Sequence, residues 1–248
     1  MIIRAILALL LALTPIGVRA EYIENPVYTD IPNYYDGLQQ SRCPQFFPFE
    51  LMSDREGLIT ICRINYAIIY DTRCKIPILT FENLVASEVD GIEPRTDVFR
   101  VDPGLLQDHA STPSDYRGSG YDRGHMVPAG DMMEDSVSML QTFYLSNVVP
   151  QNPGFNRGIW RRLEFLARSI VADREEAPTY IVTGAILNKN PTLIGDSVCV
   201  PSEMFKSIIT EPGNTTYIMD NRSGQTGDLE NYRGDLTQIF QFLGMTYD

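Results

Sequence analysis

Apolar residues along the chain fall into short runs separated by turn-forming residues, and this pattern predicts strands over much of the sequence. Residues 64–71 (INYAIIYD) are rich in β-branched and aromatic side chains, and a turn at Thr72-Arg73 separates them from a second apolar run at residues 76–80. The two runs predict a β-hairpin. Further strands are predicted at residues 179–183, 205–210 and 215–219, the last two joined by turn-forming residues 211–214.

Two segments show the period of an α-helix instead. Residues 228–243 place Leu236, Ile239, Phe240 and Leu243 at helical spacing and predict a closing helix. Residues 156–171 (NRGIWRRLEFLARSIV) lack an internal proline, follow a Pro153-Gly154 break and predict a second helix. Because strands and helices intermix without a regular βαβ order, the predicted fold class is α+β.

The rest of the chain predicts loop structure at two places. Residues 101–121 are rich in Pro, Gly, Ser and Asp and are predicted to form a loop, while residues 21–45 predict an irregular N-terminal arm. There is no internal repeat or clear linker. Residues 21–248 are therefore expected to form a single domain, which is long enough to bury a substantial core.

The first 20 residues have the layout of a secretory signal peptide. Arg4 supplies a positive charge, residues 5–13 are apolar throughout, and Val18-Arg19-Ala20 offers a cleavage site. An uncleaved membrane anchor is the alternative, but an apolar run of this length is too short to span a bilayer. We therefore expect cleavage after Ala20, a secreted or periplasmic mature protein, and no membrane association after cleavage.

The mature sequence carries residues open to covalent modification. In an oxidising compartment its even number of cysteines suggests two disulfides, with three pairings that the sequence does not distinguish. Metal ligation by the cysteines is less favoured, because no two of them have short ligand spacing. Two N-glycosylation sequons matter only in a host with that machinery. The residues concerned are Cys43, Cys62, Cys74 and Cys199, and Asn214 and Asn221.

Charge at first argues against a polyanionic partner. The net charge is −12, and loss of Arg4 and Arg19 with the signal leaves 18 basic and 32 acidic residues, or −14. Any site for nucleic acid must therefore be a local basic patch. The predicted helix at residues 156–171 holds four arginines and one acid, Glu164. A solvated face with Glu–Arg pairs is the other interpretation of this stripe.

The strongest candidate for chemistry is His125, one of only two histidines in the chain. It follows Asp122-Arg123-Gly124 at the end of a loop rich in glycine and serine. Hydrolysis of a phosphodiester needs a base that works near pH 7, and imidazole has this property. It also needs cationic groups at the phosphate, which arginine and a divalent metal supply.

The segment resembles the DRGH motif of the DNA/RNA non-specific endonucleases, the ββα-metal nucleases that include endonuclease G. The resemblance extends to a helix that carries an Asn, a Trp, a Glu and an Arg in order, and to elements from about Cys43 to near the C-terminus. It implies a ββα-metal finger built on a central, mainly antiparallel sheet flanked by helices. The residues that match the helix are Asn156, Trp160, Glu164 and Arg168.

The same resemblance implies roles for individual residues. His125 is the expected general base, and Asn156 the one direct protein ligand of Mg²⁺ or Mn²⁺, whose other ligands are water and phosphate oxygens. Glu164 is expected to hold the water shell of the metal or to orient an arginine. Arg95, or Arg100 in its place, joins the cations at the phosphate. The remaining expected residues are Arg123 and Arg168 at the phosphate, Asn147 and Asp122 in support, and Arg157 and Arg161 in substrate binding.

The sequence therefore predicts an exported, metal-dependent endonuclease that hydrolyses DNA and RNA with little sequence or sugar specificity. Two alternatives are a phosphodiesterase for smaller substrates and a non-catalytic protein that binds or takes up nucleic acid. Intact His125 and Asn156 argue against the second alternative, because binding alone needs neither a base nor a metal. A homodimer and a protein inhibitor are left open as partners.

Overall fold

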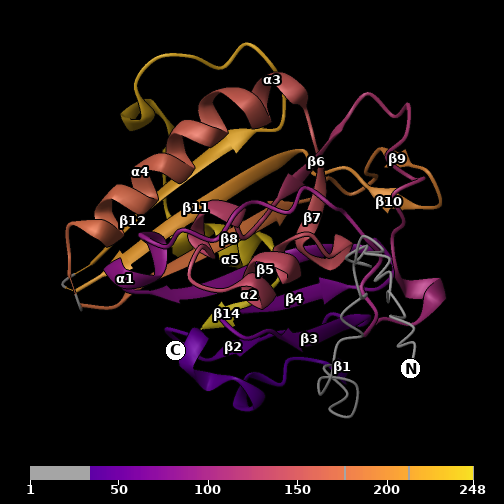
Figure 1. Ribbon diagram of the computed structural model, residues 1–248. Coiled ribbons are helices and arrows are strands. Elements are labelled where there is room, and N and C mark those ends of the chain that lie inside the picture. Colours follow the sequence, from indigo (N-terminus) through magenta and orange to yellow (C-terminus); the bar gives the residue numbers. More distant parts are fainter. Residues whose placement is uncertain (1–33, 176, 212, 248) are drawn as a thin grey trace, which may run out of the picture. The chain divides into compact units, whose positions relative to one another are not determined.

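The computed structural model describes residues 34–175, 177–211 and 213–247. In this part of the chain an eight-stranded sheet, with all neighbouring strands antiparallel, lies at the centre (Figure 1). The predicted α+β class is confirmed. The strands follow the order β1 (Tyr34–Asp36), β3 (Leu58–Cys62), β4 (Tyr66–Asp71), β5 (Ile76–Leu84), β8 (Thr179–Ile186), β11 (Glu203–Thr210), β12 (Gly213–Asp220) and β13 (Arg233–Gly234).

Short ribbons and helices surround the sheet. No helix of the described residues combines the length and the apolar character needed to cross a membrane. The helix α4 runs across the strands β8, β11 and β12 in Figure 1. The ribbons pair β2 (Leu51–Met52) with β14 (Thr246–Tyr247), β6 (Asp122–His125) with β7 (Val148–Gln151), and β9 (Leu193–Ile194) with β10 (Val198–Cys199); the α-helices are α1 (Ala86–Val89), α2 (Ser136–Thr142), α3 (Pro153–Phe155), α4 (Arg161–Ala172) and α5 (Leu236–Phe242).

The strands predicted from apolar runs are all present, each somewhat longer or shorter than its pattern. The predicted hairpin is β4 and β5, and the hairpin around residues 211–214 is β11 and β12. The closing helix is confined to Leu236–Phe242, with a separate 3₁₀ turn at Leu229–Tyr232. The interpretation of residues 21–45 as irregular is wrong at its end, since β1 pairs with β3 at the sheet edge. Residues 1–33, including the predicted signal, lie outside the described residues.

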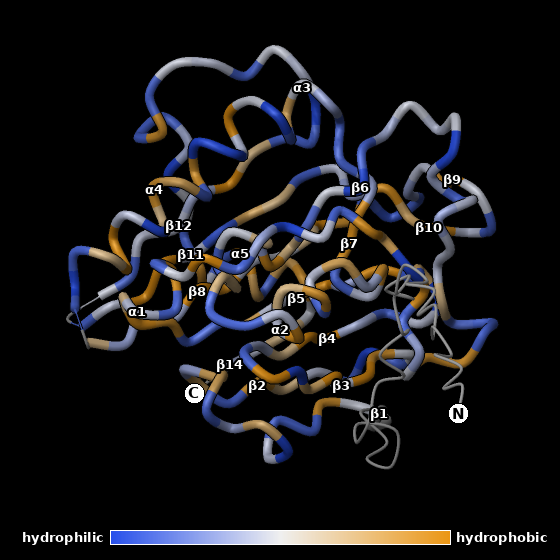
Figure 2. The backbone as a smooth tube through the Cα atoms, viewed as in Figure 1, coloured by the Kyte–Doolittle hydropathy of each residue, from blue (hydrophilic) through white to orange (hydrophobic). Residues whose placement is uncertain are grey.

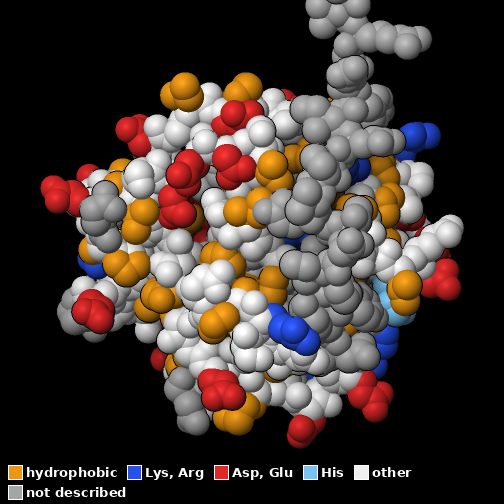
Figure 3. Space-filling view, turned by 60° about the horizontal axis from the view of Figure 1, so that its bottom comes forward, with side chains coloured by type: hydrophobic (Ala, Val, Ile, Leu, Met, Phe, Trp, Pro, Cys, Tyr) orange, Lys and Arg blue, Asp and Glu red, His pale blue; other side chains and the backbone are white. Residues whose placement is uncertain are grey.

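The two faces of the sheet differ in chemistry. On one face Phe81 and Phe205 meet a cluster of aromatic rings, in which Phe205 and Phe240 of α5 have centroids 6.3 Å apart. The opposite face carries buried polar side chains, because Thr80 pairs in register with Thr183, and Thr183 with Lys206. The tube in Figure 2 shows the central strands as largely hydrophobic, while the space-filling view in Figure 3 shows separate apolar spots on the surface. The polar face is the one on which α4 packs.

The helix predicted at residues 156–171 is not continuous. Residues Asn156–Trp160 form a π-helical turn in which Gly158 has φ −104° and ψ −110°, outside the helical region, and the regular α-helix begins only at Arg161. This turn changes the direction in which the early side chains point. Trp160, which a regular helix would place on the same side as Asn156 and Glu164, is fully buried against Phe155 and beneath Lys206.

The cysteines form two disulfides, as expected for an oxidising compartment. Cys43 pairs with Cys62, and Cys74 pairs with Cys199, with sequence separations of 19 and 125 residues. The second bond joins the turn after β4 to β10, two parts of the chain that are distant in sequence. The pairing that the sequence left open is thereby settled.

We expect removal of the Cys74–Cys199 bond to destabilise the protein more than removal of Cys43–Cys62. A cross-link lowers the conformational entropy of the unfolded chain by an amount that grows with the logarithm of the length of the closed loop. The bond that closes the longer loop should therefore add about 1–2 kcal/mol more to the free energy of unfolding. Urea unfolding of the two double alanine variants under non-reducing conditions measures the difference. Equal losses, or a larger loss for the shorter loop, would contradict this ranking.

Candidate active site

The DRGH residues lie in a strand, not at the end of a loop as predicted. Asp122–His125 form β6, which pairs antiparallel with β7 so that His125 lies opposite Val148 and Gly124 opposite Val149. Only glycine fits at position 124, because the buried side chain of Gln151 occupies the space that a Cβ atom would need. The ribbon β6–β7 leads directly into α3, the π turn and α4. This is the ββα unit that the resemblance implied.

The imidazole of His125 is held between aromatic rings. Its centroid lies 5.1 Å from the ring of Phe99 and 4.8 Å from that of Phe143, and the residue is only 8% exposed. Its buried Nε2 has no hydrogen-bond partner among the described residues. One ring nitrogen is thus free of any competing protein contact.

Burial keeps this imidazole neutral. Burial is the main cause that lowers the pKa of His125, the positive charge of Arg95 acts in the same direction and Asp97 in the opposite one. Together they bring the pKa from 6.5 to about 3. A neutral imidazole is the form that can accept a proton from water. His125 is therefore in the protonation state that a general base requires.

Asn147 fixes the backbone that follows His125. Its Oδ1 accepts from the N–H of Val127 at 3.0 Å, and its Nδ2 donates to the carbonyls of Val127 at 2.9 Å and Thr142 at 3.0 Å. The backbone carbonyl of Asn147 also accepts from Met126 at 2.9 Å. The side chain of Asn147 is therefore used within the protein, where it braces the loop that follows His125.

Asn156 is attached to the DRGH strand by its side chain. Its Nδ2 donates to Oδ2 of Asp122 at 2.9 Å, and no hydrogen bond within the described part of the chain engages its Oδ1. Partial burial opposes ionisation of Asp122, but hydrogen bonds from Arg157 and Asn156 lower its pKa below 3.8. Asp122 thus remains ionised and holds the amide so that its oxygen is available as a neutral ligand.

The helical segment from α3 through the π turn to α4, residues 153–172, is called the site helix from here on. Its start is braced by Asn221, which directly follows β12. Oδ1 of Asn221 accepts from the N–H of Asn152 at 2.8 Å, and its Nδ2 donates to the carbonyls of Pro150 and Pro201, both at 2.9 Å. Asn152 in turn caps α3. The amide that a sequon at Asn221 would offer for glycosylation is therefore engaged within the fold, whereas Asn214 is exposed.

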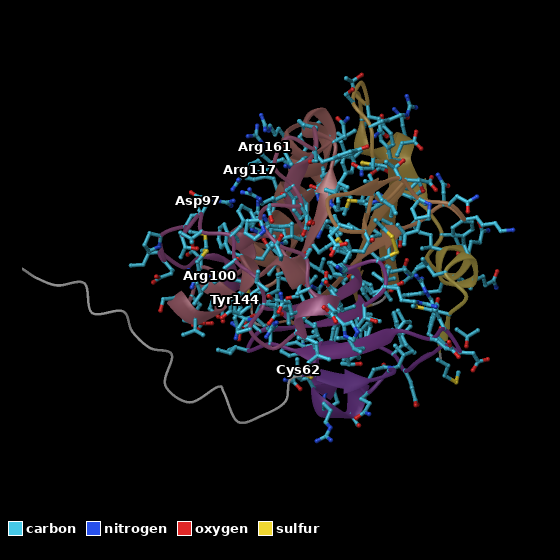
Figure 4. All side chains as sticks on the ribbon, turned by 90° about the vertical axis from the view of Figure 1, so that its right-hand side faces the viewer. Cys62, Asp97, Arg100, Arg117, Tyr144 and Arg161 are labelled. Carbon is cyan, nitrogen blue, oxygen red and sulfur yellow. A yellow bond between two sulfur atoms is a disulfide. The ribbon has the colours of Figure 1, made fainter. Side chains whose placement is uncertain are left out.

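A cavity of about 360 Å³ brings predicted site residues together. Arg123 stacks over the ring of Phe99 at 5.3 Å, and Arg95 lies 5.0 Å from the ring of Phe143 while pairing with Asp97 at 2.5 Å. The backbone of Arg100, the alternative to Arg95, forms an isolated β-bridge with that of Tyr144, and the two residues lie close together in Figure 4. The cavity is lined by Arg95, Asp122, Arg123 and Asn156, and by the aromatic residues Phe99, Tyr116 and Tyr121.

The positive patch on the helix is smaller than its sequence suggests. Arg157 forms a forked pair with Asp122, through contacts of 2.8 and 2.5 Å, and Arg162 donates to the carbonyl of Gly227. Arg161 is exposed and projects from the same side of the molecule as Arg117 in Figure 4. Much of the charge on the helix is thus compensated within the protein.

Glu164 and Arg168 point toward the polar face of the sheet, away from Asp122. Arg168 donates to Oδ1 of Asp131 at 2.6 Å. Burial raises the pKa of Glu164 to about 7, against the opposing charge of Lys206, while Asp131 raises it further. Asp131 and Lys206, with Glu82, form a buried charged cluster that sequence reasoning missed. In the strand pattern a Glu or Lys between apolar residues indicates a solvent-facing position, but α4 covers these residues.

A family model described as DNA/RNA non-specific endonuclease matches residues 52–248. Among proteins of known sequence, nuclease C1 of Cunninghamella echinulata var. echinulata is 33% identical over 205 residues, covering 75% of this chain and 81% of that protein. Human mitochondrial nuclease EXOG is 32% identical over 233 residues, covering 86% of this chain and 62% of the relative. Human mitochondrial endonuclease G is 34% identical over 176 residues, with coverage of 64% and 59%. The chain thus spans less than two thirds of these two mitochondrial relatives.

The fold is similar to a solved structure as well. A crystal structure of the EndoG/EndoGI complex, concerned with the mechanism of EndoG inhibition, superposes with a TM-score of 0.69 and 28% identity, covering 75% of this chain and 84% of that one. Sequence, fold and the ββα arrangement of His125 and Asn156 agree. The chain belongs to the DNA/RNA non-specific endonuclease family.

Proposed function

We propose that this nuclease hydrolyses phosphodiester bonds within both DNA and RNA, with His125 as general base and a divalent metal, Mg²⁺ in the first place, bound at Asn156. One observation carries the proposal. A buried, neutral imidazole contacts Phe99, a residue that lines the same cavity as the amide of Asn156. Phe99 thus connects the proposed base, which does not itself line the cavity, with the proposed oxygen ligand on the ββα unit.

The residues present fit a hydrated divalent ion. Asn156 offers a neutral amide oxygen, and the described residues contain no group of three or more His, Cys, Asp or Glu side chains placed to hold a metal. Mg²⁺ commonly keeps several waters and needs few protein ligands, so a single amide oxygen suits it. Once bound, the ion would act as a Lewis acid on the phosphate and lower the pKa of a bound water.

Arg95 and Arg123 are proposed to contact phosphate oxygens at the mouth of the cavity. The forked guanidinium matches phosphate geometry, and contacts to phosphate carry no information about sequence or sugar. Arg95 also lowers the pKa of His125. A phosphate paired with Arg95 would offset that charge, so substrate binding would make His125 a stronger base at the moment when it is needed.

Export from the cytoplasm is part of the same proposal. The two disulfides support an oxidising compartment. A homodimer and a protein inhibitor stay predictions. The chain resembles a protein crystallised with its inhibitor, which makes a search for such an inhibitor worthwhile.

We expect His125→Ala to lower the rate of plasmid and RNA cleavage at least about 100-fold, the low end for loss of a general base. The matched control is His109→Ala, since these are the only two histidines in the chain and His109 lies in the 3₁₀ turn Gln107–His109, apart from the DRGH strand. Cleavage is followed on gels with Mg²⁺ and with EDTA, using residues 21–248 at one ionic strength.

The two variants together separate the proposed functions. Cleavage that survives EDTA, or a loss no greater in His125→Ala than in His109→Ala, would sink the base-and-metal mechanism. Nucleic-acid binding without cleavage by the wild type would indicate a binding protein. Activity on dinucleotides but not on polymers would favour the phosphodiesterase for small substrates.

The pH profile should report Glu164, not His125. Because burial raises the pKa of Glu164 to about 7, its carboxylate is protonated below that pH and its negative charge is lost beside Arg168 and Arg95. We therefore expect kcat/KM to rise with pH around a midpoint near 7. His125, with a pKa of about 3, is neutral across this range.

Glu164→Gln tests the assignment of this limb. The amide cannot ionise, so the variant should be less active at pH 8 and its profile should be flat between pH 5.5 and 8, values chosen to bracket the carboxyl pKa. A limb that persists unchanged in Glu164→Gln would assign the titration to another group.

Export is tested by N-terminal sequencing of the protein from its native host. We expect the mature chain to begin at Glu21 and to be recovered outside the cytoplasm, because residues 1–20 carry the features of a cleaved signal. An intact N-terminus on protein from the cytoplasm would contradict export.

A further inference from the structure

Charged side chains are buried on the polar face of the sheet, beneath the site helix. Glu82 comes from β5, Lys206 from β11 and Asp131 from the 3₁₀ turn Ala129–Asp131. Glu164 and Arg168 face them from α4. Glu82 and Lys206 are 0% exposed and Asp131 is 1% exposed. The proposed mechanism uses Glu164 and Arg168 but assigns nothing to Glu82.

Glu82 has no donor for either carboxylate oxygen. Both Oε1 and Oε2 are buried without a hydrogen-bond partner among the described residues. The nearby donors are engaged elsewhere, since Lys206 Nζ donates to Thr183 Oγ1 at 2.5 Å and Tyr66 Oη donates to the carbonyl of Gln141 at 2.8 Å. An ionised carboxylate in such a place would be buried without compensation, which is strongly unfavourable.

Asp131 offers Glu82 a partner, provided that one of the two carries a proton. Oδ1 of Asp131 accepts from Arg168 Nη1 at 2.6 Å, while its buried Oδ2 has no donor. Oδ2 of Asp131 and both carboxylate oxygens of Glu82 are thus buried without a partner, and the two side chains are near enough for Asp131 to raise the pKa of Glu82. Two ionised carboxylates present only acceptors, so this pair forms a hydrogen bond only through a proton.

The charges of the cluster favour the same arrangement. Arg168 and Lys206 supply two positive charges to three carboxyl groups, those of Glu82, Asp131 and Glu164. One proton held among the three carboxyl groups brings the cluster to neutrality. Asp131 already accepts a charge-assisted hydrogen bond from Arg168. Of the pair Glu82 and Asp131, only Glu82 has both oxygens buried without a donor, so the proton belongs on Glu82, while Glu164 ionises around its own pKa of about 7.

We propose that Glu82 is a positioning residue that keeps its proton at neutral pH and donates it to Oδ2 of Asp131, so that Oδ1 of Asp131 holds Arg168 in place. The consequence for cleavage rests on the proposed function and, in addition, on the role at the phosphate that the sequence predicts for Arg168. Desolvation supports this protonation state, because it raises the pKa of Glu82 well above 4.5, and the nearby Asp131 raises it further against the charges of Lys206 and Arg168.

If Glu82 is protonated in the folded protein, the stability of the protein should depend on pH. A folded-state pKa raised above the unfolded value gives a contribution that is complete below about pH 4.5 and is lost as the pH rises toward the folded value. Glu82→Gln removes this dependence, because the amide is always neutral and keeps a donor for Asp131. Relative to wild type, its melting temperature should therefore increase as the pH is raised from 4.5 to 8.

Two variants at position 82 separate the hydrogen bond from simple packing. Glu82→Leu has similar volume but no donor, so Asp131 Oδ2 is left without a partner; we expect kcat/KM for plasmid to fall at least about tenfold, as loss of a buried partner implies. Glu82→Gln should recover most of that loss. Glu56→Gln is the matched control, because it makes the same substitution at an exposed site.

Infrared spectroscopy observes the proton directly and does not depend on nuclease activity. At pH 7 the wild type should show the carbonyl-stretch band of protonated carboxyl groups, to which Glu164, with its pKa of about 7, also contributes. The contribution of Glu82 is the part of the band that is lost in Glu82→Gln but retained in Glu164→Gln, Glu56→Gln and His125→Ala. A wild-type spectrum without this band, or Glu82→Gln as impaired as Glu82→Leu, would overturn the proposal. The band is measured on wild-type protein, so a variant that fails to fold leaves the test intact. A failed general-base assignment would appear in the cleavage assay of His125→Ala and leave the band unchanged.

Discussion

The hydrogen bond from Asn156 to Asp122 is the contact on which the geometry of the site depends. The proposed base, His125, lies on the strand β6 and the proposed metal ligand, Asn156, lies on the helical segment after β7, so nothing in the covalent chain fixes their separation. Asp122 provides that link, because it lies in the same strand as His125 and accepts from Asn156 at 2.9 Å. Arg157 keeps Asp122 ionised and thereby strengthens the link. Arg157, which the sequence analysis expected to bind substrate, is thus used within the protein to help position Asn156.

The pairing of arginines within the protein also bears on how an acidic protein could bind a polyanion. The arginines of the site helix are largely paired, Arg157 with Asp122 and Arg168 with Asp131. Two cations line the cavity: Arg123, which stacks over Phe99, and Arg95, which stacks over Phe143 and also pairs with Asp97. Recognition would therefore depend on short-range contacts at the cleavage point, because a net charge of −12 opposes attraction at longer range.

Sequence patterns predicted the parts of the site that depend on local order along the chain. The order of His125 and Asn156 follows from the motif, and the strands β4, β5, β8, β11 and β12 follow from short apolar runs, whereas β1, β3 and β13 were not predicted. A regular helix would place Trp160 on the same side as Asn156 and Glu164, but the π turn before Arg161 breaks that regularity. Glu82 and Lys206 were missed for another reason. Alternation along a strand identifies two faces but does not say which face another element will cover, and here α4 covers the polar one.

The π turn also shows why the break in the helix is useful. In a regular helix Asn156, Glu164 and Arg168 would share one surface, and the ion and the buried carboxyl groups would compete for it. The irregular turn separates them, so that Asn156 meets Asp122 of the ribbon while Arg168 meets Asp131 beneath the helix. A π turn costs regular hydrogen bonding, and such turns are frequent at functional sites. In this chain the turn allows one segment to carry the proposed metal ligand, Asn156, and, twelve residues later, an arginine held from the interior of the protein.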